Sequence, residues 1–270
     1  SLEEAKRLIS VDGTAKWLYQ THDGHHIETV LIPTNDRFSV CVSTQIGCAQ
    51  NCAFCRTAKM GFIRNLEAGE ILEEIIRVNW YLEETGTKHS DGSLAKVTNI
   101  IFMGMGEPLN NLEQVHRVCC TLHHQKLFNL GRKRMTISTS GVVPKIKELV
   151  DRNTPCCLAV SLNSTNDERR SAVMPVNKVW NIAKLLEATD EYTKRTGNYV
   201  TFEFVLMKGI TCSEEAAKEL IRICAPRRCK VNAIVLNDGD DPTLEAPSLE
   251  EIDHFLEIVR KAEVQITIRN

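Results

Sequence analysis

Short apolar runs rich in β-branched residues alternate along this chain with longer amphipathic stretches, and this alternation restricts its fold more than any other feature. Such repetition is typical of βα units joined into a parallel sheet. The expected strands are residues 38–43, 97–103, 135–139, 158–162, 200–206 and 230–236. Six successive βα units predict an α/β fold, a partial (β/α)6 TIM-like barrel, and a doubly wound open sheet remains the alternative.

Helical periodicity and capping residues support this assignment. Apolar side chains recur at helical spacing in residues 70–82 and 112–122, and Ser213 and Ser248, each followed by acidic residues, are expected N-caps. The length suits one large domain. We expect residues 1–36 to form an N-terminal extension of helix and strand, and residues 37–270 to form the core barrel. Because the chain begins with Ser1 and ends in a strand-like run, we expect it to be part of a longer protein.

Composition points to an intracellular protein without a membrane segment. Eleven cysteines, an odd number, occur with no secretory signal pattern, so we expect reduced thiols and a cytoplasmic location. No stretch has the eighteen or so apolar residues that a membrane helix requires. The formal net charge of −2 gives no broad attraction to nucleic acid, although local basic patches remain possible.

Three of the cysteines lie within eight residues, as Cys48, Cys52 and Cys55. Four thiolates would saturate a zinc ion or a cubane cluster, whereas three thiolates on a [4Fe–4S] cluster leave one iron open. That iron can chelate the amine and carboxylate of S-adenosylmethionine. The spacing therefore predicts a [4Fe–4S] cluster. A zinc site completed by Cys41 or a histidine is the less favoured alternative.

Residues that could contact a ligand through a side chain or the backbone follow or end several of the expected strands. They are Gly106 and Glu107, Ser138, the segment of Ser161, Leu162 and Asn163, and Asn237. In a (β/α) barrel the carboxyl ends of all strands open on one face, where such barrels place their active sites. We therefore expect one site built from strand ends, although such residues also end strands in proteins without a site there.

Five segments resemble, in order, the RlmN/Cfr family of radical S-adenosylmethionine RNA methyltransferases, and they are most similar to RlmN. They are residues 26–33 (HIETVLIP), 41–48 (CVSTQIGC), 61–66 (GFIRNL), 103–110 (MGMGEPLN) and 138–144 (STSGVVP). The resemblance runs from about residue 14 to the end. It implies a barrel of the radical SAM type and methylation of adenine C2 in 23S rRNA and tRNA.

The resemblance also implies roles for individual residues. Cys48, Cys52 and Cys55 would ligate the cluster. S-adenosylmethionine would contact Gly106, Glu107, Ser138, Ser161, Leu162, Asn163 and Asn237. Glu28 matches an acid/base position and Cys41 matches the cysteine that resolves a covalent intermediate. Asn163 departs from the family, which commonly has histidine there.

The implied reaction uses two molecules of S-adenosylmethionine and a methyl-carrying cysteine that, in the family, follows the position of Asn270. It also implies an electron donor such as flavodoxin or ferredoxin, an RNA partner and a monomeric protein. For RNA phosphates we expect contacts from Arg56, Lys59 and Arg64. A relative diverged toward another radical reaction and a zinc-binding module are the alternative functions.

Overall fold

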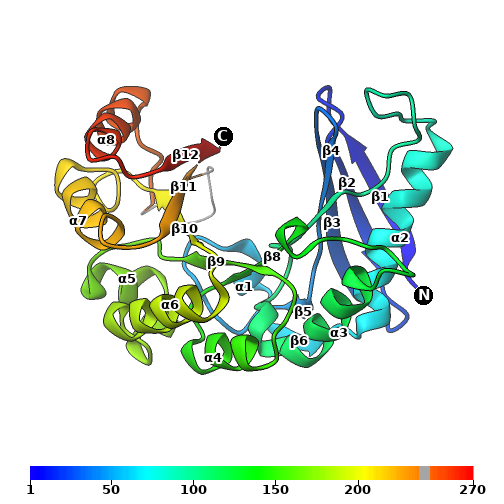
Figure 1. Ribbon diagram of the computed structural model, residues 1–270, viewed down its shortest axis with the longest axis horizontal. Coiled ribbons are helices and arrows are strands. Elements are labelled where there is room, and N and C mark those ends of the chain that lie inside the picture. Colours follow the sequence, from blue (N-terminus) through cyan, green and yellow to red (C-terminus); the bar gives the residue numbers. More distant parts are fainter. Residues whose placement is uncertain (237–243, 270) are drawn as a thin grey trace. The chain divides into compact units, whose positions relative to one another are not determined.

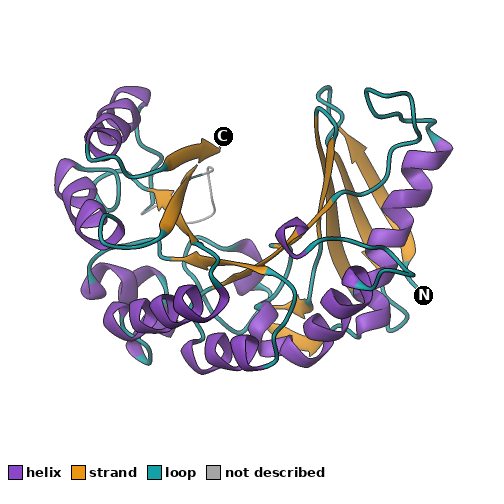
Figure 2. Ribbon diagram, viewed as in Figure 1, coloured by secondary structure: helices purple, strands orange, loops and turns teal. Residues whose placement is uncertain are grey.

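The computed structural model describes residues 1–236 and 244–269, and these residues form two compact units. Unit 1 comprises Ser1–Ala49, Met60–Ser138 and Arg152–Cys157, and unit 2 comprises Gln50–Lys59, Thr139–Asp151 and Leu158–Asn270. Both units mix helices with strands (Figures 1 and 2).

The sheet of unit 1 changes from antiparallel to parallel along its width. Its strands are β1 (Glu3–Ile9), β2 (Ala15–Gln20), β3 (His26–Thr34), β4 (Arg37–Cys41), β7 (Asn99–Phe102) and β8 (Met135–Thr139). β1 to β4 pair as antiparallel neighbours, whereas β4 pairs with β7, and β7 with β8, in parallel. A small separate hairpin joins β5 (Gln45–Gly47) to β6 (Phe62–Asn65).

The two faces of this sheet differ in burial. Ile27, Leu31, Val40 and Ile100 are fully or almost fully buried on one face, whereas alternate residues on the other face are half-buried. Helix α2 (Ala68–Glu84) runs alongside β1 to β3 in Figure 1 and presents a buried apolar stripe. Helix α3 (Leu112–His123) follows the short 3-10 helix η1 (Pro108–Asn111). One sheet face is therefore core, and the other is available for a site.

Unit 2 contains parallel strands and the helices that connect them. Its strands are β9 (Cys157–Ser161), β10 (Val200–Leu206), β11 (Cys229–Val235) and β12 (Ile266–Arg269), and each pairs in parallel with its neighbour in this order. Its helices are α1 (Arg56–Lys59), α4 (Val143–Asp151), α5 (Asp167–Val173), α6 (Ile182–Thr196), α7 (Glu214–Cys224) and α8 (Leu249–Lys261). β10 is buried almost throughout, as expected for a strand inside a parallel sheet.

The six expected strands all form, and two of them, β8 and β10, have the predicted bounds. The expected N-caps also form, because the side chains of Ser213 and Ser248 accept hydrogen bonds from the first turns of α7 and α8. Ser248 and Glu251 complete a capping box.

The helix expected within residues 1–36 is wrong, because those residues form β1, β2 and β3. The composition of Glu3–Ile9 favours a helix, but its backbone pairs with β2 as an exposed edge strand. The domain boundary expected after residue 36 stays a prediction. Unit 1 as described continues through Ala49.

Candidate functional site

The cysteine loop begins at a backbone position that only glycine can occupy. Gly47 has a φ of +71°, and a Cβ there would lie 1.7 Å from the carbonyl oxygen of Gly61. The amide of the next residue, Cys48, donates to that same oxygen at 3.0 Å. This close approach fixes the direction in which the chain leaves the β5–β6 hairpin, and Cys48 is buried there.

Cys52 and Cys55 belong to unit 2, where both are half-buried. The amide of Cys55 donates to the carbonyl of Cys52 at 3.1 Å, and the Ala53 amide donates to the Val173 carbonyl at 2.9 Å. Cys52, Ala53 and Phe54 pack with Trp180 against an apolar cluster of Val173, Met174 and Val176. Phe54 therefore lies in an apolar environment.

The donor chemistry of the loop fits an iron–sulfur cluster. Thiolates are the usual cluster ligands, and each binds a different iron, so their sulfur atoms need not converge on one point. Within the described ranges, no three Cys, His, Asp or Glu side chains are grouped to hold a single metal ion.

The Gly104–Glu107 loop after β7 packs directly on residues 42–45. A Cβ on Gly104 would lie 2.6 Å from the Val42 carbonyl oxygen, and a Cβ on Gly106 would lie 2.6 Å from the Gln45 Cβ. Gly106 also has a φ of +103°, a conformation that side chains rarely adopt. The loop thus requires glycine at both positions, and it presents backbone groups at the carboxyl end of β7.

Glu107 is buried and orders the start of η1. Its Oε1 accepts a hydrogen bond from the Leu109 amide at 3.0 Å, and its own amide donates to the side chain of Gln45 at 2.8 Å. Asn111 braces the same region by donating to the carbonyls of Thr44 and Leu66, both at 2.8 Å. The carboxylate is therefore held in a fixed orientation rather than solvated.

Glu28 and Cys41 lie on the half-buried face of the unit 1 sheet. Val30 pairs with Cys41 across β3 and β4, so Glu28 lies two positions away along β3 with its side chain on the same face. Lys16 on β2 forms an ion pair with Glu28 at 2.7 Å. The structure thus places an acid and a thiol on one accessible face, with a cation beside the acid.

In unit 2, the segment after β9 is held in an unusual conformation. Asn163 has a φ of +51° and is buried; its Oδ1 accepts from the Val205 amide at 3.0 Å and its Nδ2 lies 3.4 Å from the Met174 sulfur. The amides of Leu162 and Asn163 donate to the Glu203 carbonyl. The Asn163 side chain thus stabilises the end of β10.

Arg170 binds the backbone of two strand ends and is fully buried. Its guanidinium donates to the carbonyls of Ser140, Ser161 and Leu162, at 2.7 to 2.9 Å, and to Asn177 at 2.9 Å. Burial lowers the pKa of Arg170 to about 10, and the nearby Cys52 and Asp167 oppose this shift. Ser161 and Leu162, two expected site residues, are positioned by this arginine.

The remaining expected residues are placed as follows. Ser138 occupies the next-to-last position of β8, in unit 1. Asn237 lies outside the described residues. Arg64 donates to Asp23 and Glu70, each at 2.7 Å, so two carboxylates already engage the guanidinium that was expected to contact phosphate.

Sequence reasoning missed the side chains that support the site. These are Lys16, Gln45, Glu74, Asn111 and Arg170. Glu74 stands among the buried apolar residues of α2, but its partners Thr29 and Ser43 lie far away in the chain. Arg170 stands among other polar residues and carries no such signal. The exposed apolar residues Met60, Phe62 and Ile63 beside the cysteine loop were also missed.

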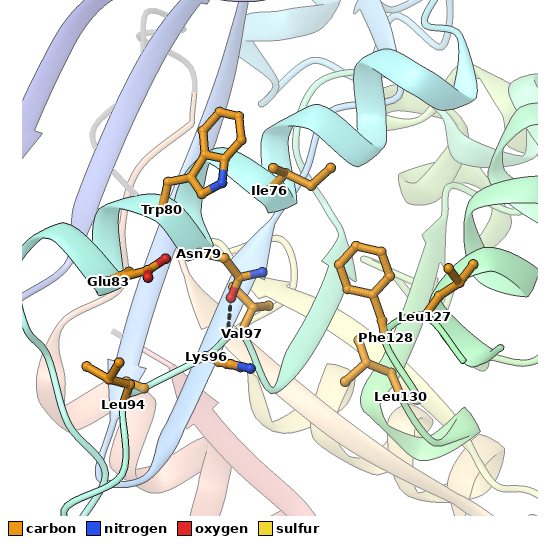
Figure 3. A pocket seen from close by; sticks show the side chains of 11 residues that line it. Ile76, Asn79, Trp80, Glu83, Leu94, Lys96, Val97, Leu127, Phe128 and Leu130 are labelled. Atoms are coloured by element: carbon orange, nitrogen blue, oxygen red, sulfur yellow. Dashed lines mark hydrogen bonds between the residues drawn. The ribbon is translucent and has the colours of Figure 1, made fainter. Parts of the chain in front are cut away.

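A pocket of about 510 Å³ lies elsewhere in unit 1, along α2 and the segments that precede β7 and β8. Figure 3 shows that apolar side chains such as Trp80, Leu94 and Phe128 line it together with polar ones such as Glu83 and Lys96. Asn79 Oδ1 accepts a hydrogen bond from the Val97 amide at 2.9 Å. None of the residues expected at the site lines this pocket.

Comparisons with known proteins match these features. Residues 42–221 match the model of the radical SAM superfamily. The crystal structure of a radical SAM methyltransferase from Sphaerobacter thermophilus superposes with a TM-score of 0.93 at 40% identity, over 99% of this chain and 76% of that one. The fold class is therefore confirmed as α/β with the parallel strands of a partial TIM-like barrel. None of the helices among residues 1–236 and 244–269 is long and apolar enough to cross a membrane.

Two similar curated relatives are each described as "Dual-specificity RNA methyltransferase RlmN". The protein from Anaeromyxobacter sp. (strain Fw109-5) is 40% identical over all of this chain and 70% of its own length. The protein from Marinomonas sp. (strain MWYL1) is 40% identical over 99% of this chain and 72% of its own length. The fold and cysteine loop define a radical SAM enzyme, a class whose members use a [4Fe–4S] cluster and S-adenosylmethionine. Within that class, the chain belongs to the RlmN family of dual-specificity RNA methyltransferases.

Proposed function

We propose that this protein methylates C2 of adenine in 23S rRNA and tRNA. The observation that carries the proposal is the Gly104–Glu107 loop, held on residues 42–45 immediately before the cysteine loop, in a chain of the RlmN family. Glu28 and Cys41 occupy one face of the adjoining strands in the same unit. Adenine C2 is a poor nucleophile, so ordinary methyl transfer cannot accomplish this reaction.

Cys48, Cys52 and Cys55 would hold the cluster, which when bound supplies the electron that cleaves S-adenosylmethionine. Backbone oxygens of the Gly104–Glu107 loop would accept hydrogen bonds from the ammonium of the methionine group. Glu107 adds negative charge near that cation. Ser138, Ser161, Leu162, Asn163 and Asn237 are the proposed contacts of its carboxylate and ribose.

Glu28 is the proposed acid/base group for proton movement at the adenine. The Lys16 ammonium pairs with the Glu28 carboxylate at 2.7 Å and so fixes its position on this face of the sheet. Once the transferred carbon joins the carrier cysteine to the base, Cys41 is proposed to attack the carrier sulfur: an S–S bond forms, the C–S bond breaks, and the released carbon takes a proton to give the methylated base. The shared face of β3 and β4 supports both roles, since both side chains would reach the same bound base.

RNA is the proposed partner, and the exposed side chains of Met60, Phe62 and Ile63 supply apolar surface beside the cysteine loop. An exposed aromatic ring can stack on an unpaired base. Arg56 and Lys59 on α1 remain candidates for phosphate contacts. A flavodoxin or ferredoxin is the proposed electron donor, and we propose a monomeric, cytoplasmic enzyme.

The test is anaerobic iron–sulfur reconstitution, followed by dithionite and S-adenosylmethionine. We expect about four irons per chain and formation of 5′-deoxyadenosine, measured by chromatography. Cys52→Ala should lose the cluster and the nucleoside. Cys120→Ala, which alters an exposed thiol on α3, is the matched control and should retain both.

A second step uses protein that includes the methyl-carrying cysteine implied by the family, and examines the product on RNA that lacks the modification. Digestion and mass spectrometry against a 2-methyladenosine standard should detect the C2 product. Deoxyadenosine formation with another modified nucleoside would favour a relative that has diverged in its reaction. Bound zinc without deoxyadenosine formation would contradict the radical mechanism.

A further inference from the structure

Glu74, on α2, is a fully buried carboxyl group that the proposed reaction does not use. Its Oε1 has no hydrogen-bond partner among the described residues. A buried carboxylate with a bare oxygen is strongly unfavourable, so such groups normally stay protonated. Burial accordingly raises the pKa of Glu74 well above its ordinary value.

The other oxygen of Glu74 joins two strands. Oε2 accepts hydrogen bonds from the Thr29 hydroxyl at 2.5 Å and from the Ser43 amide at 3.1 Å. Thr29 follows Glu28 on β3, and Ser43 lies two residues after Cys41. One buried acid therefore holds the chain beside both proposed catalytic residues.

Ser43 extends this connection to the loop after β7. Its hydroxyl donates to the Glu28 carbonyl at 2.7 Å and accepts from the Met105 amide at 3.1 Å. Met105 lies between Gly104 and Gly106, and its carbonyl accepts from the Thr44 amide at 2.8 Å. The hydrogen bonds thus run without interruption from Glu74 through Ser43 to the proposed S-adenosylmethionine loop.

We propose that Glu74 is a positioning residue: its buried carboxyl group fixes Ser43 so that the Gly104–Glu107 loop is ordered before S-adenosylmethionine binds. This role rests on the proposed function of that loop. A neutral acid suits the position because a charge there would have no compensating cation. The charged groups on α2 nearest along the chain are Glu70, Glu73 and Arg77; Arg64 binds Glu70, and Glu73 pairs with Arg77.

The first measurement is amide hydrogen exchange, followed by mass spectrometry, on peptides that cover residues 42–45 and 104–107. Glu74→Leu removes both hydrogen bonds, so exchange at the Ser43 and Met105 amides should accelerate about tenfold or more. Glu74→Gln preserves the neutral acceptor and should exchange at the wild-type rate. Glu84→Leu, the same substitution at an exposed site on α2, is the control.

The second measurement is binding of S-adenosylmethionine to the reconstituted protein by equilibrium dialysis. Glu74→Leu should weaken binding about tenfold, with unchanged iron content and an unchanged rate of deoxyadenosine formation at saturation. Glu74→Gln should restore the affinity. Wild-type exchange and affinity in Glu74→Leu would overturn the proposal.

Two milder variants apply if Glu74→Leu does not fold. Thr29→Val removes one hydrogen bond to Glu74 and should accelerate exchange at Ser43. Ser43→Ala keeps the amide that donates to Glu74, so it should accelerate exchange only at Met105. If neither variant changes exchange, the proposal is wrong. If exchange changes as expected but the wild type forms no deoxyadenosine, the positioning role stands and the proposed function fails.

Discussion

Four Gly→Ala variants in unit 1 can separate backbone strain from steric overlap at the proposed cofactor loop. Gly131 has an ordinary φ and open space around its Cβ position, whereas Gly24 has a φ of +83° and open space. Gly104 has an ordinary φ, but a Cβ there would lie 2.6 Å from the Val42 carbonyl oxygen. Gly106 has a φ of +103°, and a Cβ there would lie 2.6 Å from the Gln45 side chain and 2.9 Å from the Gln45 backbone nitrogen.

The geometry predicts an order of destabilisation. Gly131→Ala should be neutral or slightly stabilising, by up to about 1 kcal/mol. Gly24→Ala should cost about 1 to 2 kcal/mol in conformational strain. Gly104→Ala should cost about 2 kcal/mol or more, because backbone atoms of Val42 and Ser43 must move. Gly106→Ala should cost about 3 kcal/mol or more, since both effects act together.

Urea unfolding followed by the fluorescence of Trp17, which is buried in unit 1, measures these differences. S-adenosylmethionine affinity is measured in parallel. Gly104→Ala and Gly106→Ala should weaken it, whereas Gly24→Ala should not. If Gly106→Ala destabilises the protein no more than Gly24→Ala, the loop is not packed on Gln45 and the reasoning about this site fails.

Three other predictions test separate features. Ser248→Ala should cost about 1 kcal/mol, measured by urea unfolding, because it removes the N-cap of α8; no loss would contradict the capping role. The pKa of Glu74 is raised from 4.5, so as the pH rises past that value the unfolded chain releases a proton that the folded protein still holds. Folding stability should therefore fall above about pH 5 in the wild type but less so in Glu74→Gln, and a pH-independent difference between the two would refute this reasoning. Arg170→Lys should cost about 3 kcal/mol, because an ammonium cannot satisfy three carbonyls and an amide as the planar guanidinium does. Arg260→Lys, at an exposed position of α8, should be neutral, and Trp180 fluorescence during unfolding measures both variants.

Several candidate site residues could be named from the sequence because the relevant patterns are local. The three cysteines lie within one short loop, and Gly106 and Glu107 directly follow an apolar strand. The short spacing of the cysteines, and the position of Gly106 and Glu107 just after a strand, therefore restrict where these residues can lie in the fold. The contacts proposed for Ser138, Ser161, Leu162 and Asn163 with the cofactor stay predictions.

Arg64 illustrates what local patterns miss. Its position beside the cysteine loop suggested a phosphate contact, yet its guanidinium pairs with Asp23, 41 residues earlier, and with Glu70. Residues 1–36 are a second case in which pairing with residues elsewhere in the chain, rather than local composition, decides the structure. Their composition allowed a helix, but pairing among β1, β2 and β3 determines the backbone conformation.

The sequence by itself determined the α/β class, the order of the strands, the caps of α7 and α8 and the cysteine loop. Each depends on hydrophobic periodicity or on residues a few positions apart. Only the tertiary structure decided that Glu74 binds Thr29 and Ser43, which lie 45 and 31 residues away, and that Gln45 binds Glu107, 62 residues away. A buried polar group needs a hydrogen-bond partner, but only the folded backbone decides which distant residue supplies it.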